Sequence, residues 1–514
     1  MLDAFDSLHG PSGLLVPNLP VLVVTTPLIG GILTIAMGRG KGPWAWATLI
    51  TGVVFYFTVL LMQQVLAAKT GYISYELGNW PRQWGIEYRV DALNAFILLT
   101  VAGVGFVTTL YAQKSVEKEI PQDRHNFFYA VWVLAICGLL GITVTGDAFN
   151  VYVLLEISSL TVYALIAMGK DMNRQALTAS LRYLILGSVG ASFILLGIGY
   201  LMMVTGTLNM EDMHDRLAAL PDIVHHRTVL VAFAFLLCGL GMKMALFPLH
   251  MWLPKAYTYA PSAVSALLSA TATKVGIYMA FRFLFTIFGV GFSFVAMPAN
   301  LVLSVAACAG ILVTGVTAVR QTNLKRMLAY SSVGQLGYIV AGFSLANLHG
   351  VAGSVIHIFN HAVMKGGMFM AAGAIMYRLG RCDLRSIRGL GKRMPLTMAA
   401  FVAGGLGLVG FPLTAGFISK WYLVQGALEA PHMWPVAAVV LVGSLLAVAY
   451  TWRVVEAAYF QEPEGESALV TEAPLSMVAP MWILIGASVY FGVSATFTGE
   501  ISMRAAKSLL GGAP

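Results

Sequence analysis

Long apolar stretches separated by short polar segments follow one another along almost the whole chain. Fourteen of them are long enough to cross the roughly 30 Å hydrocarbon core of a bilayer as helices. The predicted spans are residues 15–37, 44–66, 91–112, 127–145, 148–168, 179–204, 228–247, 262–286, 297–319, 325–346, 351–377, 395–426, 433–458 and 474–496. The polar connections are too short to hold a soluble domain. The pattern predicts an all-α polytopic membrane protein.

The composition supports this class. Of 514 residues, 58% are apolar and 11% charged, and the mean hydropathy is +0.79, whereas charged residues make up about 25% of a typical soluble protein. The four cysteines are scattered without a CxxC or CxxCH pair, so we expect no disulfide framework, no metal and no bound cofactor. The first residues, MLDAFDSLHG, carry two acids and no lysine or arginine, which is unlike a cleaved signal peptide. The mature chain is therefore expected to begin at residue 1.

Basic residues gather in alternate connections, which predicts the orientation through the positive-inside rule. The densest group is the six lysines and arginines between Arg378 and Arg393, whereas the connection after the sixth span is acidic, as in EDMHD at residues 211–215. We predict basic connections in the cytoplasm and both termini outside, in the cell inner (plasma) membrane. The net charge of +8 is then a topology signal and no nucleic-acid-binding patch is expected.

Titratable residues inside the spans are few, and lysine dominates them. Such groups are costly at mid-bilayer and persist mainly where they face a bundle interior or water. They are Glu156, Lys243, Lys274, His357, His361, Lys365 and Lys420, with Arg182 and His250 near span ends. A lysine moved from water into a low-dielectric site loses proton affinity. The set is therefore suited to carrying protons.

Three of these residues are spaced by four in the stretch HIFNHAVMK, residues 357–365. His357, His361 and Lys365 would stack on one helix face over about 12 Å, at about 1.5 Å per residue. Imidazole can accept a proton on one nitrogen and donate it from the other. This face is predicted to form part of a proton wire.

Each residue also has a structural interpretation. Glu156 and Lys243 could form a fixed buried ion pair, Lys274 could extend toward an interface, and Lys420 could cap a helix end. The histidines could hold a metal or haem, although two histidines four residues apart without an acidic ligand are weak evidence, or one could serve packing alone. His250 could cap an interrupted helix or join the wire.

Proline and glycine interrupt two predicted spans beside lysines. Pro248 and Pro254 follow Lys243, and the glycine- and proline-containing segment 410–416 precedes Lys420. Each break frees backbone polar groups, which a membrane tolerates only beside protein or a wet cavity. Broken helices at corresponding places of two halves indicate an inverted-repeat transporter.

Four segments resemble the signature segments of the antiporter-like subunits shared by respiratory complex I, membrane-bound hydrogenases and Mrp-type cation/proton antiporters. They are GDAFNVYVLLEISSLTVYALI, FPLHMWLPKAYTYAPSAVSALLSATATKVGIY, NLKRMLAYSSVGQLGYI and GFPLTAGFISKWYL, which occur in family order. Within this family, ELGNWPRQWGIEYRVDALNAF and TGTLNMEDM look most like the D-type subunit of Mrp monovalent cation/proton antiporters.

The resemblance implies fourteen helices with two inverted five-helix repeats, helices 4–8 and 9–13, of which helices 7 and 12 are broken. The implied divisions are residues 1–125 for helices 1–3, 126–290 for the first repeat, 291–460 for the second, and 461–514 for helix 14 and the tail.

The resemblance also implies proton transfer by particular residues. Glu156 matches the family's glutamate on helix 5, and Lys243, Lys274 and Lys420 match its lysines on helices 7, 8 and 12. The run from His357 to Lys365 matches a helix-11 run in some relatives. The chain departs from a complex I subunit that has glutamate at the helix-12 position.

Three function classes remain open. The first is a proton-translocating subunit of a multisubunit Mrp-type antiporter, a transporter subunit and not an enzyme, with other membrane subunits, lipids, protons and Na⁺ or another monovalent cation as partners. The second is a proton-pumping subunit of complex I (NADH–quinone oxidoreductase) or of a membrane-bound hydrogenase. Its electrons would run in a partner, because this chain carries no redox-cofactor motif. The third is a passive scaffold or quinone-binding subunit.

Overall fold

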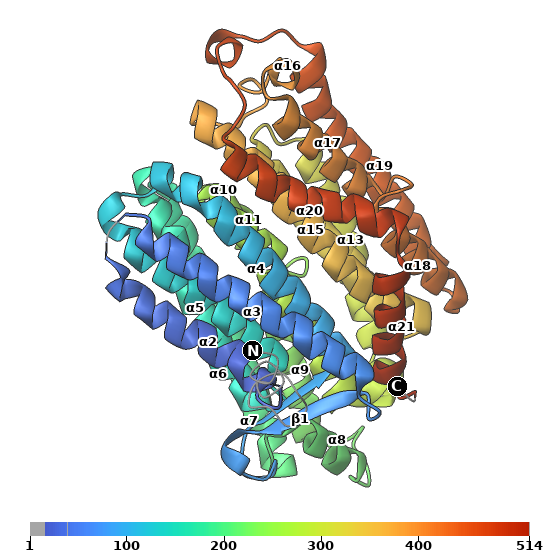
Figure 1. Cartoon of the computed structure of the whole chain (residues 1–514). Coiled ribbons are helices and arrows are strands. Elements are labelled where there is room, and N and C mark those ends of the chain that lie inside the picture. Colours follow the sequence, from blue (N-terminus) through green and yellow to red (C-terminus); the bar gives the residue numbers. More distant parts are fainter. Residues whose placement is uncertain (1–15, 39, 513–514) are drawn as a thin grey trace.

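The protein is a bundle of long helices, as shown by a computed structural model that describes residues 16–38 and 40–512 (Figure 1). The expectation that the chain lacks a cleaved signal peptide concerns residues that lie outside this described part. The helices up to the first break are α2 (Leu19–Thr34), α3 (Gly42–Ala67), α4 (Ala92–Glu119), α5 (His125–Val144), α6 (Ala148–Ala167), α7 (Gln175–Thr205), α8 (Met210–Ala218) and α9 (Arg227–Lys243).

The chain continues through shorter helices into a second set of long ones. These are α10 (Leu253–Tyr259), α11 (Ser262–Ala270), α12 (Ala272–Phe281), α13 (Ala299–Val319), α14 (Leu324–Ser344), α15 (Leu348–Leu379), α16 (Leu390–Arg393), α17 (Pro395–Val409), α18 (Ala415–Glu429), α19 (Trp434–Val455), α20 (Leu475–Val493) and α21 (Thr496–Leu509). Every predicted span coincides with one of these helices or with a consecutive pair.

Ten helical segments of the described residues are long and apolar enough to cross a membrane. The remaining four predicted spans coincide with α9, α14, α15 and the pair α17–α18. Helices α9, α17 and α18 have only 17, 15 and 15 residues, and α14 and α15 carry many buried polar residues. A polytopic membrane protein is confirmed, while the number of fourteen spans stays a prediction.

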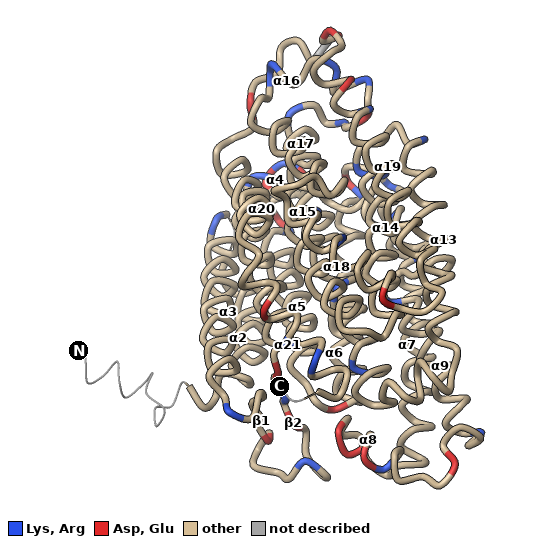
Figure 2. The backbone as a smooth tube through the Cα atoms, turned by 90° about the vertical axis from the view of Figure 1, so that its right-hand side faces the viewer, with Lys and Arg blue, Asp and Glu red and all other residues tan. Residues whose placement is uncertain are grey.

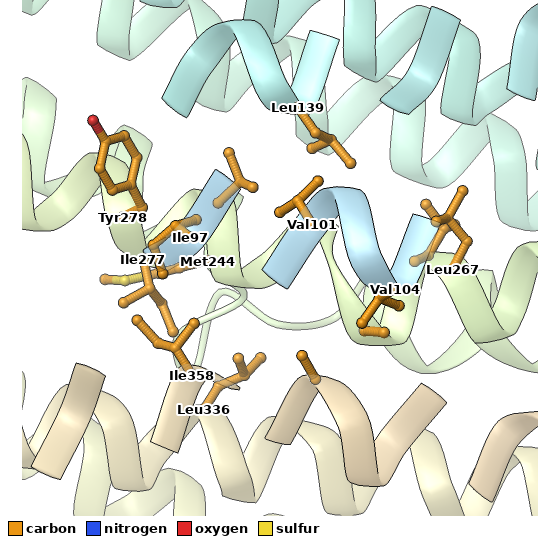
Figure 3. Close-up of a cluster of buried hydrophobic side chains, with 14 of the residues drawn as sticks. Ile97, Val101, Val104, Leu139, Met244, Leu267, Ile277, Tyr278, Leu336 and Ile358 are labelled. Atoms are coloured by element: carbon orange, nitrogen blue, oxygen red, sulfur yellow. The ribbon is translucent and has the colours of Figure 1, made fainter. Parts of the chain in front are cut away.

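Helix α15 lies inside the bundle. Residues 350–375 of this helix are all buried, and α4, α11, α14, α17, α18 and α20 pack around it. Figure 3 shows part of the core, in which apolar side chains of helices from both halves of the chain meet; among them are Ile97, Val101, Leu139, Ile277, Leu336 and Ile358. Because α15 is shielded from lipid, polar side chains on it can be tolerated.

The two ends of the bundle differ in structure. At one end the antiparallel strands β1 (Tyr72–Glu76) and β2 (Glu87–Asp91) form a hairpin, where the sequence indicated only a polar connection. The helix α8 lies at this end as well, and α16, within the arginine-rich connection, lies at the opposite end (Figure 1). Figure 2 shows charged residues concentrated at both ends, with few between them.

Both predicted helix breaks are present. After Lys243 the helix stops, with φ of +54° at Ala245, and α10 resumes at Leu253. Between α17 and α18 the φ angles of Gly410 and Leu413 are +84° and +70°.

A third break was not expected. The predicted span 262–286 divides at Thr271, whose φ and ψ are −125° and −58°, into α11 and α12. The predicted span itself is present as the apolar segment Ser262–Ile287, and no glycine or proline marks the interruption at Thr271 in the sequence.

Candidate functional site

The predicted proton-transfer residues inside the spans lie on five helices, α6, α9, α12, α15 and α18. Lys274, His357, His361 and Lys365 have no exposed surface, and Lys243 and Lys420 are each 7% exposed. The set therefore holds four lysines and two histidines but only one acid, Glu156. Ion pairing within the set can satisfy at most one of these lysines. The other lysines must therefore donate hydrogen bonds to neutral groups.

Lys243 contacts a hydroxyl group and not the acid. Its Nζ donates to Ser159 Oγ at 3.0 Å, and no ion pair joins Lys243 to Glu156 among the described residues. The carboxylate interacts with Lys243 only through space, and its Oε1 atom is buried without a hydrogen-bond partner in the described part of the chain. The predicted pair thus lies in an open arrangement, which differs from the fixed ion pair that was the alternative.

A small cavity adjoins Lys243. Its volume is about 20 Å³, and Lys243, Ser159, Tyr183 and Gly276 are among the residues that line it. One water molecule needs at least about 10–15 Å³ and two or more polar partners. The cavity is therefore large enough for a single water between Lys243 and the break that separates α11 from α12.

Lys274 lies directly after that break. Its Nζ donates to the backbone oxygen of Ser269, in the last turn of α11. Carbonyl groups at the end of a helix lack intrahelical partners, so the lysine stabilises the interruption that produced them. Lys274 is completely buried, which excludes the alternative in which it extends toward an interface.

The predicted face of α15 is present, and its three members have different surroundings. Lys365 donates to Leu328 O at 2.9 Å and to Ser331 Oγ on α14. The ring of His361 stacks on that of His357 with centroids 6.0 Å apart and planes 7° apart. Within residues 16–38 and 40–512, neither ring nitrogen of His361 has a hydrogen-bond partner, although Lys274 and Lys365 both act on it electrostatically.

His357, in contrast, is held at both ring nitrogens. Nδ1 lies 2.8 Å from Ser419 Oγ on α18, and Nε2 lies 3.0 Å from Gln335 Oε1 on α14. The imidazole therefore bridges two neighbouring helices across α15. The alternative in which this histidine serves packing alone therefore does not describe His357, because both of its ring nitrogens have polar contacts.

Lys420, on α18, forms hydrogen bonds to the end of α17 across the second helix break. Its Nζ donates to Leu408 O at 2.7 Å, to Val409 O at 3.0 Å and to Ser444 Oγ at 2.8 Å. These two carbonyls are the last two of α17. Lys420 therefore caps the end of this helix, as the structural alternative expected. The ammonium also lies 4.7 Å from the centre of the Tyr338 ring, which makes an edge contact with His357.

His250 lies in the interruption between α9 and α10, where its ring stacks on Phe247 at 5.3 Å. Its Nδ1 is buried without a partner among the residues described, so neither the capping interpretation nor a place in the wire has a hydrogen bond from this atom to support it. Arg182 is exposed on α7. The histidines of α15 have no third His, Cys, Asp or Glu placed to complete a metal site in the described part of the chain.

Polar cavities flank the buried residues at the two ends of the bundle. A cavity of about 240 Å³ includes Glu119, Ser262 and Lys325 in its lining, beside the start of α11. A cavity of about 330 Å³ at the hairpin end includes Asp91 and Arg282, which form an ion pair of 2.7 Å. The two cavities lie at opposite ends of the bundle, one beside the start of α11 and one beside the hairpin.

The sequence did not single out the polar neutral residues that contact the lysines and histidines. They are Ser159, Ser331, Gln335, Ser419 and Ser444. A local signal existed for two of them, because Ser159 lies three residues after Glu156 and Ser419 directly precedes Lys420. The other three are on helices whose contacts the sequence does not reveal.

Comparison with known proteins relates the chain to subunits of membrane complexes. Residues 145–447 match the family described as NADH:quinone oxidoreductase/Mrp antiporter, transmembrane. NADH-quinone oxidoreductase subunit N of Desulforudis audaxviator is 41% identical over 483 residues, covering 91% of this chain and 94% of that protein. The D-type subunit of the Na⁺/H⁺ antiporter of Bacillus subtilis is 27% identical over 494 residues, covering 96% of this chain and 97% of that protein.

A solved structure agrees in fold over nearly the whole length. A chain of the membrane-bound sulfane sulfur reductase, an archaeal respiratory membrane complex, superimposes with a TM-score of 0.86 at 30% identity. The likeness covers 96% of this chain and 98% of that one.

Proposed function

The chain belongs to the NADH:quinone oxidoreductase/Mrp antiporter transmembrane family, and from this premise we propose that it translocates protons as one membrane subunit of a multisubunit complex. The observation that carries the proposal is the set of buried lysines and histidines without matching acids. Like charges at short range oppose simultaneous protonation. Such a set is suited to passing a proton along and poorly suited to holding several.

We propose a route through the predicted proton-transfer residues. It begins at Glu156 and Lys243, continues through Lys274 to the α15 face of His361, Lys365 and His357, and ends at Lys420, with His250 at its margin. Electrostatic interactions of Lys274 with His361, and of Lys420 with His357, support this order. Water molecules would bridge the side chains that do not contact one another, because buried polar sites commonly hold ordered water.

The finer organisation is part of the same proposal. The breaks after Lys243 and before Lys420 support two inverted five-helix repeats at residues 126–290 and 291–460, between helices 1–3 (1–125) and the C-terminal part (461–514). The positive-inside rule supports an arginine-rich end, containing α16, that faces the cytoplasm of a cell whose plasma membrane holds the complex.

Two driving forces are possible for this protein. The motifs that resemble the D-type subunit support an Mrp-type complex that exchanges protons for Na⁺ or another monovalent cation. The 41% identity to a protein named for NADH-quinone oxidoreductase favours a second candidate, a pump driven by electron transfer in partner subunits. The same buried residues would serve either complex.

Everted membrane vesicles that contain the assembled complex test both candidates. A pH-sensitive dye reports whether the vesicle interior becomes more acidic or less acidic. It is read after addition of Na⁺ or K⁺, and separately after addition of an electron donor such as NADH. Proton movement on cation addition alone supports the antiporter, and movement that needs the donor supports the pump.

Lys274→Ala and Lys420→Ala should abolish this signal while the complex still assembles, because each removes a proton-accepting amine. Lys69→Ala is the matched control, since Lys69 is an exposed lysine and its variant should transport normally. Full transport by both buried-lysine variants would reject the proposed function.

A further inference from the structure

His357 is the one histidine of the buried set whose two ring nitrogens are both engaged. Its partners, Gln335 and Ser419, are 2% and 0% exposed and reach it from α14 and α18. His361, one turn away, has no hydrogen-bond partner on either nitrogen among the described residues. The two histidines of this face therefore differ in their hydrogen bonding.

The hydrogen-bond partners fix the tautomer of neutral His357. An amide oxygen can only accept, so the nitrogen facing Gln335 Oε1, which is Nε2, carries the hydrogen. Nδ1 then presents a lone pair, and the Ser419 hydroxyl donates to it at 2.8 Å.

The Ser419 hydroxyl has a second possible acceptor. Its Oγ lies 3.1 Å from the carbonyl oxygen of Gly416, in the first turn of α18 after the break. One hydroxyl hydrogen can point to only one acceptor at a time. Ser419 can thus donate either to His357 or to the backbone of its own helix.

We propose that Ser419 and Gln335 are positioning residues that let His357 gain and lose a proton without losing a hydrogen bond. When a proton binds Nδ1, that nitrogen becomes a donor to Ser419 Oγ, and the serine O–H turns to Gly416 O. Nε2–H continues to donate to Gln335 throughout. When the proton leaves, the hydroxyl turns back. This inference rests on the proposed function, whose path includes His357.

The charged surroundings explain why neutral partners are needed. The titratable groups that face His357 are Tyr338 on α14, Lys420 on α18, Lys274 on α12 and His361 on its own helix. None of these four is a carboxylate. A protonated ring can therefore be stabilised here only by neutral acceptors, and the two that contact it are Gln335 and Ser419.

Two substitutions should shift the pH profile of transport in opposite directions. Ser419→Ala removes an acceptor of the protonated ring, so the alkaline limb of the profile should move to lower pH by about one unit, which is a tenfold change in proton affinity. Gln335→Glu places an acidic acceptor beside Nε2 and should move the same limb to higher pH. Ser419→Thr keeps the hydroxyl and should keep the profile.

Proton transport by the assembled complex in everted vesicles is measured across pH, with assembly checked for each variant. Ser344→Ala is the matched control, because Ser344 is equally buried but donates only to Ala341 O in its own helix. Unchanged profiles in both Ser419→Ala and Gln335→Glu, or shifts in the same direction, would overturn the inference.

The Lys274→Ala variant separates the two possible failures. If it abolishes transport while the Ser419 and Gln335 variants behave like the wild type, only the positioning role is wrong. If Lys274→Ala and Lys420→Ala both transport normally, the proposed function itself fails. If Ser419→Ala does not assemble, Gln335→Glu and Ser419→Thr still decide the outcome, since the inference requires a shift in the first and none in the second.

Discussion

Lys243 donates its hydrogen bond to Ser159 at 3.0 Å, while Glu156, one helical turn earlier on α6, keeps a buried carboxylate oxygen without a partner in the described part of the chain. The lysine thus has two alternative acceptors, a neutral hydroxyl and a carboxylate, three residues apart on one helix. Contact with the carboxylate would favour the charged lysine, and contact with the hydroxyl favours it less. We predict that movement between the two acceptors loads and releases a proton.

Removal of the neutral acceptor should trap the lysine. In Ser159→Ala, the carboxylate of Glu156 is the remaining side-chain acceptor, so the pair should close and proton transport should fall about tenfold, equivalent to about 1.4 kcal/mol of added stabilisation of the closed pair. Transport by everted vesicles measures the effect. Ser158→Ala is the matched control, since Ser158 donates only to Leu155 O, and an equal loss in both variants would contradict the prediction.

Glu156→Gln distinguishes a switch from a fixed ion pair. Because the carboxylate makes no close ion pair with Lys243, the substitution should leave thermal stability within about 0.5 kcal/mol while transport stalls at every pH. Breaking a true buried pair would cost about 3–5 kcal/mol. The apparent Tm of the purified complex, measured beside transport, separates the two outcomes, and wild-type transport would reject the switch.

The two stacked histidines should differ in their effect on stability. His357→Leu removes the hydrogen bond to the buried Gln335 Oε1, while Ser419 can still donate to Gly416 O, and it should destabilise the protein by about 1–3 kcal/mol. His361→Leu removes no hydrogen bond to a described residue and should change stability much less. Thermal unfolding of both variants checks this, and equal losses of stability would show that the hydrogen bonds of His357 contribute little.

Glu119 should stabilise the start of α11 although it lies on α4. Its carboxylate accepts from the Ser262 backbone N–H at 2.6 Å and from Ser115 Oγ at 3.1 Å, which provides a partner for an otherwise unpaired helix N-terminus. Glu119→Ala should therefore lower stability by about 1–2 kcal/mol, as measured by thermal unfolding.

Glu117→Ala is the matched control for this position. Glu117 pairs with Lys114 on the same helix, and both side chains are 34% exposed, so its loss should change stability by at most about 1 kcal/mol. If the two variants melt at the same temperature, Glu119 does not act as a cap.

The orientation can be tested with single cysteines in a chain whose four native cysteines are replaced by alanine. Arg385 and Asp222 are both exposed, in connections at opposite ends of the bundle. A membrane-impermeant thiol reagent added to intact cells should label Asp222→Cys and leave Arg385→Cys unlabelled. Labelling of Arg385→Cys alone would reverse the orientation.

Much of the helical framework could be predicted from the sequence, because its causes are local. An apolar run long enough to span a bilayer forms a helix because its backbone groups must be satisfied within the segment, and the glycines and prolines around Lys243 and Lys420 interrupt helices through their own backbone restrictions. The spacing of four residues from His357 to His361 and to Lys365 likewise fixes a shared face without knowledge of any other helix.

The tertiary structure alone decided which groups these residues contact. Gln335 and Ser419 are 22 and 62 residues from His357, and a serine carries no signal that it will face a histidine. The break at Thr271 has no glycine or proline to announce it, yet Lys274 satisfies the carbonyl that it frees. The sequence by itself determined where helices form and which titratable side chains they carry, since both depend on neighbouring residues. Packing of distant helices determined whether Lys243 meets an acid or a hydroxyl, because a hydrogen bond depends on positions that no local pattern specifies.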